Sequence, residues 1–124
     1  MPMVRSTLVL SAIYLALVGV GLLLFPLQFG VGAVPGDASP QLIALLRLLG
    51  GPFLGIATLN WLSRNSAPSS IRAVLLANLV GFGIVAANDV LSVSLGEARE
   101  AAKYFLLVHL AFATAFLLVL RKAR

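Results

Sequence analysis

The sequence has 124 residues, of which 60% are hydrophobic and only 10% are charged, with a formal net charge of +5. Soluble domains contain about 45–50% apolar and about 25% charged residues, so this composition excludes an ordinary soluble domain. A membrane-spanning helix takes about 20 residues, and four such helices would leave only about 40 residues of this chain for loops and tails. The chain has no cysteine, which excludes thiol–disulfide chemistry and thiolate-bound metals within it.

Four apolar segments follow one another along the chain, each bounded by charged residues, proline or glycine. They cover about residues 4–25, 40–62, 71–95 and 101–120. These segments are much longer than the roughly 9–11 residues of a membrane β-strand, and a helix satisfies its backbone hydrogen bonds within the segment. The sequence therefore predicts an all-α fold, an integral membrane antiparallel four-helix bundle that forms a single transmembrane domain over residues 1–124.

The second segment carries a glycine–proline sequence near its middle, Gly50-Gly51-Pro52, followed by Gly55. A proline inside a helix removes a backbone hydrogen bond and bends the helix. Gly51 and Gly55 are four residues apart, a spacing that allows another helix to approach closely. We interpret these residues as helix-packing and kink positions, and the alternative is a hinge that accommodates a ligand.

Polar residues recur on one face of the third segment. Asn78, Gly81 and Asp89 are spaced so that they share a face of a helix, and Asn88 lies beside it. Gly81 also belongs to a run of small residues at a spacing suited to helix packing. The fourth segment carries the only histidine of the chain, His109.

Three ionisable residues inside the predicted spans need an explanation, namely Arg47, Asp89 and His109. A charged side chain at the bilayer centre costs about 2.5–3.5 kcal/mol, so each needs a partner or a wet cavity. At a rise of about 1.5 Å per residue, all three would lie at a similar depth in the outer half of the membrane. We expect Arg47 and Asp89 to form an ion pair with His109 hydrogen-bonded to it.

The candidate site is this polar cluster, which consists of Arg47, Asp89, His109, Asn88, Asn78 and Tyr14. Three interpretations stay open at this point. The cluster could be a structural ion pair that sets helix register, a binding site for a lipid-, quinone- or sterol-like molecule, or part of a proton path.

Basic residues are concentrated on one side of the predicted bundle, which carries Arg5, Arg64, Arg72, Arg121, Lys122 and Arg124. The opposite side carries only Arg99 and Lys103, together with acidic residues. Because Lys and Arg are enriched in cytoplasmic loops, both termini are predicted to be cytoplasmic in a multi-pass protein of the inner (plasma) membrane.

The first segment ends in Leu24-Phe25-Pro26, and the second contains Arg47-Leu48-Leu49-Gly50-Gly51 before Gly55 and Trp61. In a chain of four spans, this pattern resembles the DoxX-like small four-helix membrane proteins of bacteria, which include an uncharacterised group of similar size. The resemblance implies a four-helix fold, and it places Arg47 at the arginine of that family's R-x-x-G element. The chain lacks the cysteines that members linked to thiol redox systems would use.

Enzymatic activity has no support, because the P-loop, H-E-x-x-H and G-x-S-x-G motifs are all missing. No cofactor or metal is expected, since one histidine cannot form a bis-histidine haem site within the chain. We expect a non-enzymatic membrane protein that binds a lipid- or quinone-like ligand or acts as an accessory subunit of a membrane complex. The alternative is a small homodimeric transporter or channel with proton coupling through Asp89 and His109. The expected partners are membrane lipids and either further copies of the chain or a larger membrane complex, and nucleic acid is not expected.

Overall fold

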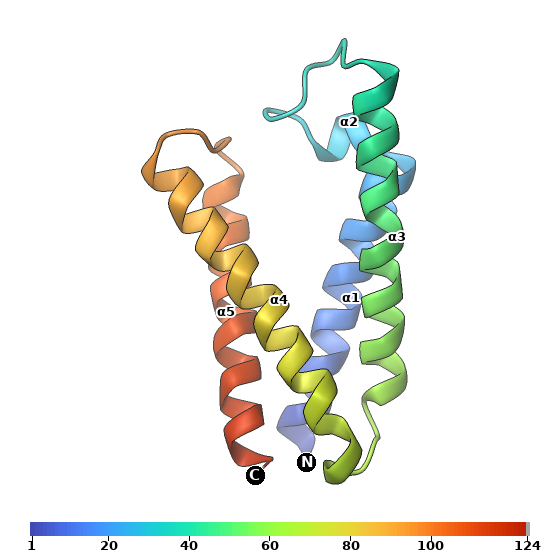
Figure 1. Ribbon diagram of the computed structural model, residues 1–124, viewed down its shortest axis with the longest axis vertical. Coiled ribbons are helices and arrows are strands. Elements are labelled where there is room, and N and C mark those ends of the chain that lie inside the picture. The colour runs from blue at the N-terminus through green and yellow to red at the C-terminus, as the bar shows by residue number, and fades with distance from the viewer. Residues whose placement is uncertain (124) are drawn as a thin grey trace. The chain divides into compact units, whose positions relative to one another are not determined.

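The computed structural model describes residues 1–123, and this part of the chain is helical without strands. The helices are α1 (Pro2–Leu24), the short α2 (Pro26–Phe29), α3 (Pro40–Ser63), α4 (Pro68–Ser94) and α5 (Ala102–Lys122) (Figure 1). All except α2 are long and apolar enough to cross a membrane. This confirms the predicted fold class, an all-α protein of membrane-spanning helices. Arg124, which the predicted orientation counted, lies outside the described residues.

The helix starts are explained by prolines. Pro26, Pro40 and Pro68 each begin a helix, a position where the missing N–H would have no partner within the helix anyway. At the start of α3 the Leu42 N–H donates to Ser39 Oγ at 3.2 Å, which supplies an N-terminal cap. The observed bounds therefore agree with the predicted segments to within a few residues.

The C-terminal end of α4 is closed by a glycine in a left-handed conformation. Gly96 has φ +69°, and the N–H groups of Gly96 and Glu97 donate to the carbonyls of Val93 and Ser92 at 3.2 and 3.0 Å. This is the Schellman motif, in which glycine takes a φ that costs other residues energy. It ends α4 and turns the chain toward α5.

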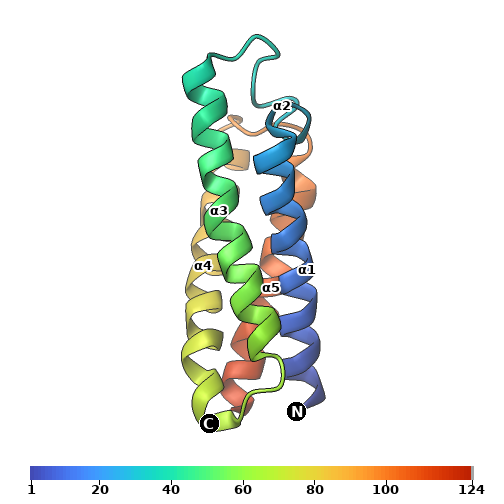
Figure 2. The ribbon, with the colours of Figure 1, turned by 90° about the vertical axis from the view of Figure 1, so that its right-hand side faces the viewer.

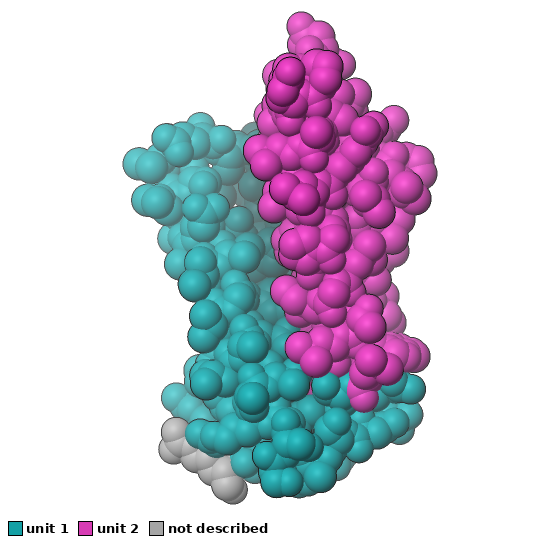
Figure 3. All heavy atoms as spheres, turned by 45° about the vertical axis from the view of Figure 1, so that its right-hand side comes forward, with its two compact units in different colours: residues 1–7, 63–124 teal, residues 8–62 magenta. Residues whose placement is uncertain are grey.

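The chain divides into two compact units, coloured differently in Figure 3. Unit 1 contains Met1–Thr7 and Ser63–Arg124, and unit 2 contains Leu8–Leu62. Unit 1 is built on the antiparallel hairpin of α4 and α5, and in unit 2 most of α1 runs beside α3 (Figures 1 and 2). The single transmembrane domain stays a prediction.

Unit 2 has a close backbone contact between α1 and α3. A Cβ atom at Gly50 would lie 2.7 Å from the Gly19 carbonyl oxygen and 3.1 Å from the Leu23 Cβ. Apart from chain neighbours and the backbone of its own helix, a Cβ atom at Gly51 or Gly55 would meet no described atom within 4 Å. The glycine that packs α3 against α1 is therefore Gly50, while its neighbour points into open space.

A buried hydrogen bond also joins α1 and α3 in unit 2. The side-chain amide of Asn60 donates to Ser11 Oγ at 3.0 Å, and Ser11 Oγ donates to the Leu8 carbonyl at 3.0 Å. Asn60 and Ser11 are both fully buried. Polar groups that pair across helices in an apolar environment stabilise the helix contact and its register.

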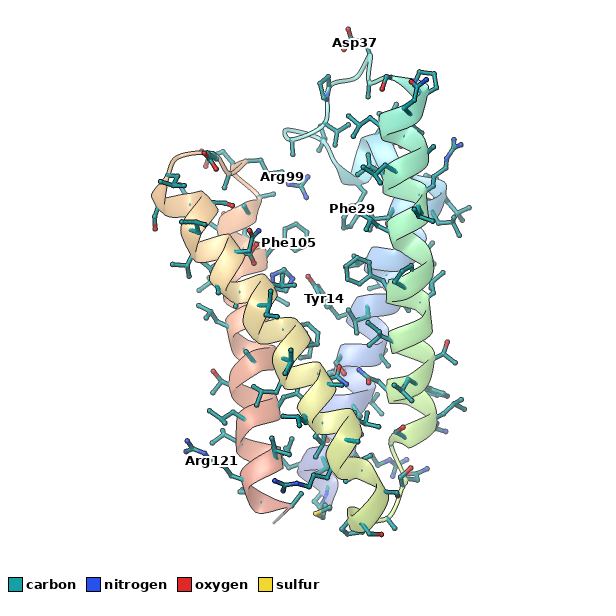
Figure 4. The ribbon with its side chains drawn as sticks, in the orientation of Figure 1. Tyr14, Phe29, Asp37, Arg99, Phe105 and Arg121 are labelled. Carbon is teal, nitrogen blue, oxygen red and sulfur yellow. The ribbon has the colours of Figure 1, made fainter. Side chains whose placement is uncertain are left out.

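Opposite ends of unit 1 carry different groups. At one end Lys122 Nζ lies 3.6 Å from Met3 Sδ, so the start of α1 and the end of α5 are adjacent. At the other end, an exposed ion pair of 3.7 Å joins Glu100 of the α4–α5 connection and Lys103 of α5. Arg121 and Arg99 mark these two ends of the α4–α5 hairpin in Figure 4.

Candidate functional site

The strongest candidate site lies within the α4–α5 hairpin of unit 1, where Asp89 and His109 meet. Asp89 lies five residues before the end of α4 and His109 seven residues after the start of α5, which is about 8 and about 10 Å along the two helices. The hairpin therefore brings them to the same level. Oδ2 of Asp89 is 2.5 Å from Nδ1 of His109.

The pair is largely removed from solvent, since the exposed fraction of the side chain is 13% for His109 and 18% for Asp89. An imidazole whose Nδ1 donates to a carboxylate is held in one ring orientation, with Nε2 as the acceptor of the neutral ring. Such a ring becomes a donor at Nε2 when it takes up a proton. The pair can therefore hold or exchange a proton and can hydrogen-bond a polar group.

Aromatic rings surround the His109 imidazole within the hairpin. Its centroid is 6.2 Å from the stacked ring of Phe105 and 6.3 Å from the tilted ring of Phe82. Phe82 in turn stacks on Phe112 and Phe116, with centroids 4.8 and 5.7 Å apart. These spacings are those of favourable aromatic contacts. The Asp89–His109 pair is thus a polar site in a column of aromatic rings. We call this the aromatic column, and it consists of Phe82, Phe105, Phe112 and Phe116.

Helical spacing explains the column. Phe105, His109, Phe112 and Phe116 follow one another at intervals of four, three and four residues along α5, which places them on one face. Phe116 is fully buried and Phe82 nearly so, so the rings form the inner face of the hairpin.

A cation caps the column near the α4–α5 connection. The guanidinium carbon of Arg99 lies 5.4 Å from the centre of the Phe105 ring, a cation–π geometry. Figure 4 labels both residues at this end of the hairpin. From the connection inward, the order is a cation, a phenyl ring, the Asp89–His109 pair and then further phenyl rings.

The other residues of the predicted cluster are distributed over both units. In unit 1, Asn88 is exposed on α4, whereas Asn78 is buried and its side-chain amide donates to the Val74 carbonyl at 2.9 Å. In unit 2, Arg47 is exposed on α3 and Tyr14 is half-buried on α1. The ion pair of Arg47 with Asp89 would join residues of the two units, and it stays a prediction.

The predicted packing residues also lie in different environments on α3 and α4. Gly50 is buried against α1. Pro52 is exposed inside the continuous helix α3, and Gly81 is exposed on α4 with no described atom within 4 Å of its Cβ position.

Sequence reasoning missed Phe82 and Arg99 as parts of the site. A signal for Phe82 was present, because residues 82, 86 and 89 are spaced to share one helix face. Arg99 lies in a connection without helical periodicity, so no pattern could place its guanidinium over a particular ring.

Within residues 1–123, no group of three or more His, Cys, Asp or Glu side chains could hold a metal ion. No protein-family model matches the chain, and neither a curated protein nor a solved structure matches it. The resemblance to DoxX-like proteins therefore stays a prediction, and function has to be argued from the site itself.

Proposed function

We propose that this small multi-pass membrane protein is non-enzymatic and binds an amphipathic, lipid-like or quinone-like ligand at the Asp89–His109 pair. The observation that carries the proposal is the pair itself, a hydrogen bond of 2.5 Å between two largely buried ionisable side chains in apolar helices. Ionisable residues within spans are costly and mark functional sites by default.

The surroundings of the pair suit a ligand with a polar group on a flat or apolar body. Asp89 orients the His109 ring, so the pair presents a polar group in a fixed position to a ligand. Phe105 stacks on the same imidazole, so a flat ring would find an aromatic partner beside its hydrogen-bonding group. The pair supplies recognition and the phenyl rings supply apolar contact area.

The aromatic column favours binding over conduction through the hairpin. On the inner face of the hairpin, the rings that follow the pair away from the α4–α5 connection are Phe82, Phe112 and Phe116, and the buried amide of Asn78 lies one helical turn beyond Phe82 on α4. A layer of phenyl rings offers no hydrogen-bonding groups to a proton. The phenyl rings of α4 and α5 therefore favour a ligand site over a continuous proton path through the hairpin.

The binding proposal is tested with purified protein in nanodiscs of zwitterionic lipid, titrated with a short-chain quinone and a short-chain phospholipid. We expect saturable binding of one of them that weakens about tenfold in His109→Gln, which corresponds to one lost hydrogen bond of about 1.4 kcal/mol. Leu107→Ala is the matched control, because Leu107 lies two residues away and is 65% exposed. Equal affinity in the wild type and His109→Gln, or no saturable binding of either probe, would contradict the proposal.

A transporter with proton coupling through Asp89 and His109 is the alternative, and the same hydrogen bond motivates it. It predicts a pH-dependent solute flux in proteoliposomes that Asp89→Asn abolishes. Ligand binding without any flux supports the binding role instead.

A role as an accessory subunit or homo-oligomer is favoured by exposed glycines. Gly51 and Gly55 on α3, and Gly81 and Gly83 on α4, have open space at their Cβ positions among the described residues. Small residues on exposed membrane helices let a second helix approach closely. Cross-linking in native membranes tests this role, which predicts adducts that Gly55→Leu or Gly81→Leu removes.

We also propose that both termini face the cytoplasm in an inner membrane, with membrane lipids as the surrounding partners. This orientation is supported by the basic residues at one end of unit 1, which are Arg5, Arg64, Arg121 and Lys122. The chain has no cysteine, so single cysteines report accessibility cleanly. We expect Ser66→Cys to react only from the cytoplasmic side and Glu97→Cys only from the opposite side, and the reverse pattern would contradict the orientation.

A further inference from the structure

Unit 1 contains a cavity of about 380 Å³ at the end remote from the Asp89–His109 pair. Its walls come from the start of α1, the α3–α4 connection and the start of α4, and its polar lining consists of Arg5, Arg64, Asn65 and Ser66. The volume lies in the range of about 300–1,000 Å³ that small-molecule sites occupy. Two arginines therefore line one cavity together with an asparagine and a serine.

The electrostatic surroundings of this cavity are positive. Residues 1–7 and 63–88 of unit 1 contain no acidic residue, and the first carboxylate along α4 is Asp89. Asp89 follows Pro68 by 21 residues, which is about 30 Å along the helix and several times the Debye length of about 8 Å at physiological ionic strength. Along these segments of unit 1, arginine side chains therefore occur without any Asp or Glu side chain.

The start of α4 adds to the positive potential. Pro68 lines the cavity and is the first residue of this helix, and the N-cap residue Ala67 makes no capping hydrogen bond with its side chain. The N-terminus of a helix carries a partial positive charge and favours anions. The charge of the two arginines and the orientation of α4 therefore both favour a negatively charged ligand in this cavity.

We propose that this cavity binds the phosphate group of an anionic ligand at the membrane surface. Arginine presents a planar set of donors that matches phosphate oxygens in pairs, and Arg5 and Arg64 contribute two such groups. The cavity lies where α3 ends and α4 begins, which is the level of lipid headgroups for membrane-spanning helices. Val4 and Pro68 supply apolar lining for the carbon atoms next to a phosphodiester.

Two sources could supply this phosphate chemistry, a phospholipid headgroup or a soluble phosphate compound. The binding site is independent of the proposed function, because it lies at the other end of unit 1. The competing explanation is that the basic residues only orient the protein in the membrane, which requires their charge but no cavity.

The test measures the affinity of the detergent-solubilised full chain for dioctanoyl phosphatidylglycerol, dioctanoyl phosphatidylcholine and inorganic phosphate. We expect saturable binding of phosphatidylglycerol that is much tighter than binding of phosphatidylcholine. Removal of one charged hydrogen-bonding group weakens binding about tenfold, so Arg5→Gln/Arg64→Gln should weaken it about a hundredfold. The control Arg121→Gln/Lys122→Gln removes the same charge from the same end but outside the cavity lining, and it should weaken binding less than about threefold.

The probes distinguish the two sources. If inorganic phosphate binds as tightly as phosphatidylglycerol and displaces it, the ligand is a soluble phosphate compound. If only phosphatidylglycerol binds tightly, the ligand is a lipid. Both results support the phosphate site. The proposal would be overturned if the two double variants lose the same affinity for phosphatidylglycerol. It would also be overturned if the protein binds phosphatidylglycerol no more tightly than phosphatidylcholine and does not bind phosphate.

A second variant keeps the test decisive if the glutamine variant is not recovered folded. Arg5→Lys/Arg64→Lys retains both charges, and hence the membrane orientation, but loses the paired donors of the guanidinium group. We expect about tenfold weaker phosphatidylglycerol binding from this change. Binding equal to that of the wild type would overturn the arginine geometry on which the site depends.

Discussion

Because α1 and α3 approach each other closely at Gly50, we predict that alanine substitutions at Gly50 and Gly51 change the stability differently. In Gly50→Ala the new methyl group would lie 2.7 Å from the Gly19 carbonyl oxygen, a backbone atom, and 3.1 Å from the Leu23 Cβ. The two helices would have to separate locally, and overpacking of this kind costs about 1–3 kcal/mol. In Gly51→Ala the methyl group would meet no described atom within 4 Å apart from its chain neighbours and the backbone of its own helix.

The comparison with Gly51→Ala accounts for the difference in helix propensity between glycine and alanine, which also affects the measured stability. Alanine stabilises a helix relative to glycine by about 0.5–1 kcal/mol at both positions, but at Gly51 the ring of Pro52 opposes this gain, because it disfavours the helical conformation of a preceding residue that has a Cβ atom. The difference in unfolding free energy between the two variants therefore reports the packing contact at Gly50, about 1–3 kcal/mol, less the opposing strain between a Cβ atom at position 51 and Pro52. Gly51→Ala should be more stable than Gly50→Ala.

The assay is reversible unfolding in mixed micelles, followed by far-ultraviolet circular dichroism as the denaturing detergent is increased. A third variant, Gly19→Ala with Gly50→Ala, should lose less stability than the sum of the single losses, because both methyl groups separate the same two helices. Equal unfolding free energies for Gly50→Ala and Gly51→Ala, or a larger loss at Gly51, would refute the assigned helix face.

Three further stability predictions concern polar groups. Asp89→Ala and His109→Ala should each cost about 1–3 kcal/mol because each removes the hydrogen bond between two largely buried side chains, and the double variant should cost clearly less than their sum in a double-mutant cycle. The predicted Arg47–Asp89 ion pair requires the same coupling between Arg47→Ala and Asp89→Ala, and strictly additive losses would rule the pair out. Asn60→Ala should cost about 0.5–1.5 kcal/mol in the unfolding assay through its lost hydrogen bond to Ser11, and no loss of stability would contradict that contact.

Much of the fold could be predicted because lipid restricts the choices. A long apolar segment has to be a helix if its backbone groups are to be satisfied in a membrane. Prolines at residues 26, 40 and 68 then mark where helices begin. The level at which Asp89 and His109 meet also followed from the constant rise of the helix, since both lie a similar distance from the α4–α5 connection.

Helix rotation could not be predicted from the pattern. All sides of a membrane helix are apolar, so hydrophobic periodicity is too weak to tell a packed face from a lipid-facing one. Gly50 and Gly51 are adjacent and chemically identical, and only the three-dimensional contact shows that Gly50 packs on Gly19. The role of Asn60 depends in the same way on its partner Ser11, which is 49 residues away in the sequence.

Native mass spectrometry of the protein extracted from its own membranes, compared with the His109→Gln variant, tests the central claim most directly. The claim is that the Asp89–His109 pair in the aromatic column binds an amphipathic molecule. The account predicts that the wild type retains one molecule of defined mass, of lipid or quinone size, and that His109→Gln has lost it. The same retained molecules in both proteins, or none in either, would contradict the claim.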